Sequence, residues 1–302
     1  MITQTTPQVK LTQASLSLPQ FLIDQHAFFG TNILANVHTT IDDFVQIQEA
    51  YRPRDLKFII IAASPKENDR VAEVVQEHRD LFLGAQLLVV PRKDLPWPYT
   101  SPKEIEAQIA SPSVVGLKVV TSLVDTPIDD PALGNYATIA ESAKKPFLIH
   151  CCSKGEKYTS PERNRRFVEA HPLLKTVLAH FGGLRAEYMA AAIKLSQEFP
   201  NVYLNTAGMA GWMRTHKRTD SGIEVQSEFH QSLYELCLDH ISRVSLHPQL
   251  CTRIIAGTDY PIEPQHTFAP LDKLQKESRE QIMNNAAQLY FGKPIESLFS
   301  PV

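Results

Sequence analysis

Short apolar runs rich in β-branched residues recur along this chain, and each is followed by a longer segment with an amphipathic pattern. Near-continuous apolar runs of this length are typical of strands covered on both faces, as in a parallel sheet. Pro after Ser or Asp begins several of the intervening segments, which indicates helix N-termini. The strand-like runs are residues 21–24, 57–63, 86–90, 114–120, 146–150, 175–180, 201–205 and 252–257.

Eight strands alternating with helices predict a (β/α)8 TIM barrel, and the length of 302 residues fits that fold. A doubly wound open sheet is the alternative, because local patterns do not show whether a sheet closes. No linker rich in Gly, Ser or Pro divides the chain, so we expect one domain over residues 21–302 after a lead-in at 1–20. The expected helices are residues 41–51, 66–80, 102–110, 131–143, 161–170, 184–198, 226–242 and 281–292.

Composition excludes several classes of protein. The net charge of −3 and the lack of a basic stripe give no reason to expect a nucleic-acid partner. The apolar runs are far shorter than the ~20 residues that span a bilayer, and residues 1–20 lack the pattern of a signal peptide. The four cysteines form no C-x-x-C pair. We therefore expect a reduced, cytoplasmic protein.

Polar residues lie at or near the ends of several apolar runs. Because the C-terminal ends of the strands form one mouth in a (β/α)8 barrel, these side chains should converge there. They are His26, Lys118, His150, His180 and Asp259.

Each of these residues also has a purely structural interpretation. A histidine at a strand end can bond to the backbone, and Asp259 in "GTDYP" suits a turn. Lys118 lies inside an apolar strand, where it must reach solvent, pair with a carboxylate or serve a site. One shared site is the more economical account of all five. Two imidazoles and a carboxylate are a common zinc ligand set that leaves a position for water.

The order of these segments resembles the amidohydrolase superfamily. The similarity is to its branch of TIM-barrel proteins that includes metal-dependent hydrolases and decarboxylases of the aminocarboxymuconate-semialdehyde type. It runs from about residue 21 to residue 292, and "AHFGG" and "GTDYP" are its most specific parts. The segments that carry it are "IDQHAFFG", "VVGLKVV", "PFLIHCC", "TVLAHFGG", "NVYLNTAG", "IIAGTDYP" and "IMNNAAQLYFG".

The resemblance implies roles for four of the polar residues. His26, His150 and Asp259 would bind one divalent metal, for which we expect zinc, and His180 would be a ligand or a catalytic imidazole. Asp259 would orient or deprotonate the attacking water, and His180 would stabilise the oxyanion. Lys118 stands where some superfamily members carry a lysine, which is carbamylated in the two-metal enzymes. We assign it no metal role, only a place in the site.

Phe28 departs from the family pattern, because the second histidine of the opening D-x-H-x-H-x-G should stand there. Residues two apart on a strand share a face, so Phe28 should line the site beside His26. A phenyl ring cannot ligate a metal. The remaining ligands could still hold one ion, Cys152 could supply a thiolate, or the site could work without metal. Cys152 could equally be a small buried residue, and Arg185 is a further candidate for the rim of the site.

We therefore expect a metal-dependent hydrolase of a small amide, ester or lactone. A metal-dependent decarboxylase of a small unsaturated or aromatic acid is one alternative. A metal-free lactonase or a non-catalytic binding barrel is another, and Phe28 is its main support. The expected partner is a small molecule, with a carboxylate as the favoured class. Barrels of this kind are frequently homodimers, but no interface is visible in the sequence.

Overall fold

The fold is seen in a computed structural model. It describes residues 8–9, 18–32, 37–151, 157–183, 185–209, 215–219, 222–226, 239, 241–260, 265–266, 268, 271 and 274–299.

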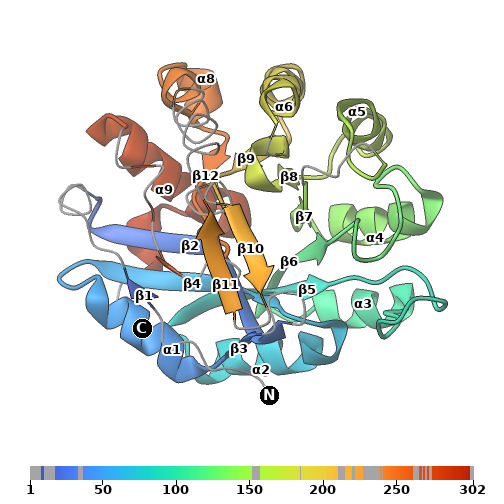
Figure 1. Cartoon of the computed structure of the whole chain (residues 1–302), viewed down its shortest axis with the longest axis horizontal. Coiled ribbons are helices and arrows are strands. Elements are labelled where there is room, and N and C mark those ends of the chain that lie inside the picture. Colours follow the sequence, from blue (N-terminus) through green and yellow to red (C-terminus); the bar gives the residue numbers. More distant parts are fainter. Residues whose placement is uncertain are drawn as a thin grey trace.

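A curled, mostly parallel sheet forms the centre of the molecule, with helices outside it (Figure 1). Within the described residues the sheet has nine strands in the order β12-β9-β8-β7-β6-β5-β4-β2-β3, and only β3 pairs antiparallel. The strands are β2 (Phe21–Asn32), β3 (Val37–Thr39), β4 (Asp55–Ala62), β5 (Phe82–Leu88), β6 (Val114–Val119), β7 (Phe147–Ile149), β8 (Thr176–Leu178), β9 (Val202–Asn205) and β12 (Ile254–Ile255). Each predicted run overlaps one of the eight parallel strands.

The two ends of this sheet are joined by backbone hydrogen bonds between β2 and the segment that follows β12. The amide of Phe28 donates to the carbonyl of Tyr260 over 2.7 Å, and the amide of Asp259 donates to the carbonyl of His26 over 2.8 Å. Ala27 and Tyr260 form a parallel bridge. The predicted TIM barrel is therefore confirmed, and its closure lies beside the candidate site.

Helices follow the strands largely where the sequence predicts them. Thr40 and Ser101 begin their helices with reciprocal capping boxes, and Asp130 caps the next one. The predicted helix over 226–242 lies mainly outside the described residues. The helices are α1 (Ile41–Ala50), α2 (Asn68–Glu77), α3 (Pro102–Ile109), α4 (Pro131–Ser142), α5 (Pro161–Ala170), α6 (Ala186–Glu198), α8 (Pro248–Cys251) and α9 (Lys276–Phe291).

Two smaller strand pairings lie outside this sheet. Strands β1 (Gln8–Val9) and β13 (Gln265–His266) pair in parallel, and β10 (Thr215–Thr219) forms an antiparallel hairpin with β11 (Gly222–Gln226). No helix among the described residues is both long enough and apolar enough to cross a membrane.

A bulge in β2 determines which of its side chains point into the barrel. Asp24 pairs with Phe58 and Ala27 pairs with Ile60, so two residues of β2 oppose one residue of β4. A bulge of this kind redirects the extra residue and sharpens the local twist. Here the two residues are Gln25 and His26, and both are fully buried.

The turn after β8 holds His180 in an unusual conformation. His180 and the following Phe181 have φ angles of 53° and 54°, in the left-handed region that non-glycine residues rarely adopt. Gly182 continues the turn with φ of 85°. A Cβ atom there would clash with the Cβ of Ala192 on α6. The turn thus requires glycine both for its backbone and for its contact with α6.

Replacing Gly182 by Ala should lower the free energy of unfolding by about 2–3 kcal/mol, through a left-handed alanine plus overpacking. Urea denaturation measures this loss. Gly292 ends α9 with φ of 64°, and a Cβ atom there would have no neighbour within 4 Å, so it is the matched control. Gly292→Ala should cost about 1 kcal/mol, since only the backbone term applies. Equal losses would show that the contact with α6 is not tight.

Candidate functional site

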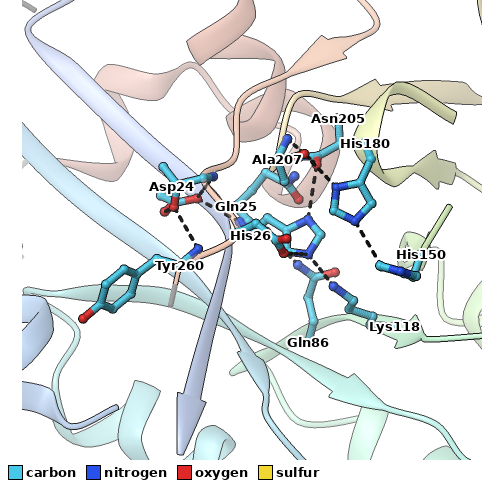
Figure 2. A network of polar contacts seen from close by, with 12 residues as sticks. Asp24, Gln25, His26, Gln86, Lys118, His150, His180, Asn205, Ala207 and Tyr260 are labelled. Carbon is cyan, nitrogen blue, oxygen red and sulfur yellow. Dashed lines mark hydrogen bonds and ion pairs between the residues drawn. The ribbon is translucent and has the colours of Figure 1, made fainter. Parts of the chain in front are cut away.

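His26 lies at the centre of a buried polar cluster at the C-terminal ends of the strands (Figure 2). Its Nδ1 donates to Oδ1 of Asn205 over 3.2 Å, and the same oxygen accepts the amide of Ala207 over 2.9 Å. An amide oxygen only accepts hydrogen bonds, so the proton of the neutral ring lies on Nδ1. The lone pair on Nε2 is therefore directed into the cluster.

Lys118 approaches that lone pair from β6. Its side chain is fully buried, and Nζ donates to Nε2 of His26. Nζ also lies 4.3 Å from the ring centre of Phe28, in a cation–π contact. Burial lowers the pKa of Lys118 to about 7, while the negative charge of Asp259 opposes this shift.

Asp259 provides the negative charge of the cluster. It follows β12 with φ of 68°, and its Oδ1 lies 3.1 Å from Nε2 of His26. Among the described residues, neither carboxylate oxygen has a hydrogen-bond partner. Burial alone would raise the pKa of Asp259, but the positive charges that His26, His180 and Lys118 carry in acid outweigh it and lower the pKa. Asp259 is thus an ionised, buried acceptor.

His150 and His180 form a second pair next to the first. Nδ1 of His180 donates to the carbonyl of Ala207 over 2.7 Å, so its Nε2 accepts a hydrogen bond from Nδ1 of His150 over 3.0 Å. Burial lowers the pKa of His180 to about 4 and that of His150 well below 6.5. Burial followed by the charge of Lys118 also lowers the pKa of His26. All three imidazoles are therefore neutral near pH 7.

Asp24 accepts hydrogen bonds from both chain segments that carry His26 and Asp259. Its Oδ1 accepts the amides of His26 and Thr258 over 3.0 and 3.1 Å, and its Oδ2 accepts the hydroxyl of Thr258 over 2.5 Å. These bonds connect the bulge of β2 to the loop that carries Asp259. Asp24 thereby holds the two halves of the site in register.

Most of the predicted site residues lie together. His26, Phe28, Lys118 and Asp259 make one cluster, and the ring of His180 is 5.8 Å from that of His26, centre to centre. The His26 and Phe28 rings are 5.7 Å apart, which confirms that they share a face.

Two predicted residues remain. The contacts described for Arg185, the N-cap of α6, are with Glu187 and Tyr188 of that helix. Cys152 lies outside the described residues, so its role as a substitute ligand stays a prediction.

Sequence reasoning missed the residues that orient the cluster. Asn205 ends β9 as a polar residue after an apolar run, which is the signal that singled out His150 and His180. Gln25 and Gln86 had no such signal. They are buried beneath His26, where Gln86 Nε2 donates to the carbonyl of Gln25 and Tyr290 donates to the side chain of Gln25.

The divalent ion implied by the family resemblance does not fit this arrangement. A catalytic metal needs about three protein donors directed at one point. The lone pair of His26 Nε2 accepts from Lys118, and position 28 offers only a phenyl ring. Nδ1 of His150 donates to His180, so Nε2 is the one nitrogen of His150 that could bind a metal. Among the described residues, no three His, Cys, Asp or Glu side chains are placed to share an ion. The predicted ligand set of His26, His150 and Asp259 stays untested.

A separate hollow of about 470 Å³ lies at the N-terminal end of the strands. Its lining includes Phe21 of β2, Glu277 and Glu280 of α9, and Glu296. It contains no residue of the His26 cluster and lies at the opposite end of β2.

Comparison with solved structures finds the same fold in other proteins. A 5-carboxyvanillate decarboxylase from Sphingomonas paucimobilis is 14% identical, with a TM-score of 0.52 and coverage of 90% of this chain and 99% of that one. A dihydroxybenzoic acid decarboxylase from Polaromonas, with bound manganese and the inhibitor 2-nitroresorcinol, is 16% identical, with a TM-score of 0.58 and coverage of 89% and 96%. A probable 2-pyrone-4,6-dicarboxylic acid hydrolase from Acinetobacter baumannii, with citric acid bound, is 14% identical, with a TM-score of 0.54 and coverage of 92% and 95%.

Sequence comparison gives the family. No curated protein sequence matches this chain significantly. The sequence pattern of the amidohydrolase family matches residues 40–292. That stretch contains every candidate site residue except those of β2, and the TIM barrel is the fold of the structural relatives. The chain therefore belongs to the amidohydrolase family.

Proposed function

We propose that this chain hydrolyses a small lactone or ester that carries a carboxylate, with Asp259 as the general base. The observation that carries the proposal is the state of Asp259. It is ionised and buried, and both of its oxygens lack hydrogen-bond partners among the described residues. Both oxygens can therefore accept a hydrogen bond from a water molecule placed against them, and Asp259 can take that proton as the water oxygen bonds to the acyl carbon.

The reaction consumes one water. Asp259 removes a proton from water as the water oxygen bonds to the acyl carbon, and the carbonyl oxygen takes the negative charge. The tetrahedral intermediate then re-forms its carbonyl and breaks the acyl C–O bond. The leaving oxygen takes the proton from Asp259, which restores the carboxylate. A lactone opens to a hydroxy acid without losing carbon, and an ester gives an acid and an alcohol.

The buried charges of the site balance each other. With the three histidines neutral, these charges are Lys118 and Asp259. When Asp259 takes up the proton of the water, the negative charge that develops on the acyl oxygen replaces the charge of the carboxylate. The pyrone-dicarboxylate hydrolase among the structural neighbours is named for a substrate that carries carboxylates.

Decarboxylation is the second candidate, because two of the structural neighbours are named as decarboxylases of aromatic acids. A divalent metal, zinc by our sequence prediction, belongs to that version and to the metal-dependent hydrolase. Metal binding would require Nε2 of His26 to give up its hydrogen bond from Lys118. It would also require a third donor beside His26 and Asp259.

A panel of substrates separates these proposals. We expect loss of 2-pyrone-4,6-dicarboxylate with release of one acid equivalent per turnover and no carbon dioxide. A pH-stat titration measures the acid, and headspace analysis measures the carbon dioxide. A 2-pyrone without carboxylates is the matched control and should react far more slowly. Carbon dioxide release from 5-carboxyvanillate or 2,6-dihydroxybenzoate, with the pyrone untouched, would contradict the hydrolase.

A further inference from the structure

Lys118 is a fully buried lysine to which the proposed hydrolytic step assigns no role. A lysine ammonium deep in a protein is costly unless several groups stabilise it. Three do so here: Nε2 of His26 accepts its proton, Asp259 offers the opposite charge, and the face of Phe28 lies 4.3 Å from Nζ. All of these side chains are at most 3% exposed.

Phe28 and Lys118 act as a pair in this arrangement. A histidine at position 28 would direct a nitrogen toward the space that Nζ now fills. The phenyl ring instead presents the negative face of its π-system to the ammonium group. A divalent ion near Nε2 of His26 would face the ammonium group directly and be repelled by it.

We propose that the ammonium group of Lys118 is the resident cation of this site and stands in place of a divalent metal ion beside His26 and Asp259. Its position beside the base suits it to stabilise the oxyanion. Both ring nitrogens of His180, the sequence-predicted oxyanion donor, are already engaged by His150 and Ala207. The catalytic part of this inference rests on the proposed function, whereas the exclusion of metal does not.

Metal binding tests the exclusion without any substrate. Wild type, Phe28→Leu and Phe28→His/Lys118→Met would be dialysed against zinc and then against manganese, and bound metal measured by plasma mass spectrometry. We expect less than about 0.1 ion per chain for wild type and Phe28→Leu, and about one for the double variant, which gains a donor and loses the cation. Phe28→Leu is the control, because it removes the ring without adding a ligand.

Two results would overturn the exclusion. One is a wild type that binds about one ion per chain and loses it in His26→Ala. The other is a double variant that is folded by circular dichroism and still binds none.

The catalytic part has its own readout. Lys118→Met should lower kcat about a hundred-fold or more with little change in KM, because an oxyanion donor acts mainly in the transition state. Lys145→Met is the control, since Lys145 bonds to backbone carbonyls of Ile109, Ser111 and Val114, away from the cluster. Unchanged kcat in folded Lys118→Met would reject this role. A wild type with no hydrolase activity would reject the proposed function. The metal-binding experiment would then be the remaining test of the inference about Lys118.

Discussion

Hydrolysis should fall about 10³-fold in kcat when Asp259 is replaced by Asn, because the amide cannot take the proton of the attacking water. The substitution keeps the size of the side chain. It also removes the negative charge opposite Lys118, so the loss combines proton transfer with charge balance. KM should change little, since the proposed role of Asp259 is in the chemical step. Steady-state kinetics on the pyrone substrate measure both constants.

Asp129→Asn is the matched control for this variant. Asp129 pairs with Arg163 and Arg166 of α5, away from the His26 cluster. The Asp129→Asn variant should retain the wild-type kcat, although it also loses one negative charge. A folded Asp259→Asn enzyme with near wild-type kcat would show that another group is the base.

Replacing Asp24 by Ala should have the largest effect on stability, a loss of about 3–5 kcal/mol in the free energy of unfolding. Asp24 is fully buried and accepts two backbone amides and the hydroxyl of Thr258. Its removal would leave these donors of His26 and Thr258 without an acceptor at the closure of the barrel. Urea denaturation followed by circular dichroism gives the loss.

Asp130→Ala is the control for this measurement. Asp130 also accepts a backbone amide, that of Ala132, as the N-cap of α4, but it is partly exposed. Its loss should cost about 1 kcal/mol. If the two variants lose equal stability, Asp24 is not essential to barrel closure.

Much of the barrel could be predicted, because apolar runs rich in β-branched residues have few alternatives to a covered parallel strand. The extent of β2 could not. It continues to Asn32 because Gly30, Thr31 and Asn32 pair with β3, which is a tertiary contact. The helix that follows β12 also begins earlier than predicted, at Lys276, because its first turns carry few apolar residues.

The ends of the strands predicted which residues would meet, but not how they would bond. His26 and Asn205 are 179 positions apart, and Lys118 and His26 are 92 apart, so no local pattern pairs them. Phe28 marked a departure from the family's ligand pattern in the sequence. That Lys118 would lie over its ring became visible only in three dimensions.

The bulge in β2 is the clearest case of structure that local sequence does not encode. Strict alternation predicts that Gln25 points away from the face that His26 shares with Phe28. Gln25 does contact Tyr290 of α9 while His26 reaches Lys118. The additional residue that β2 places against β4 between Asp24 and Ala27 is a matter of strand register, which the local pattern does not predict.

The most direct test of Lys118 and Asp259 as the working pair is turnover of 2-pyrone-4,6-dicarboxylate by the wild-type protein before and after exhaustive treatment with a strong chelator. With Lys118 as the cation and Asp259 as the base, we predict the same kcat in both samples and no gain on adding zinc or manganese. Loss of activity on chelation that either metal restores would contradict the role of Lys118 as the cation of the site.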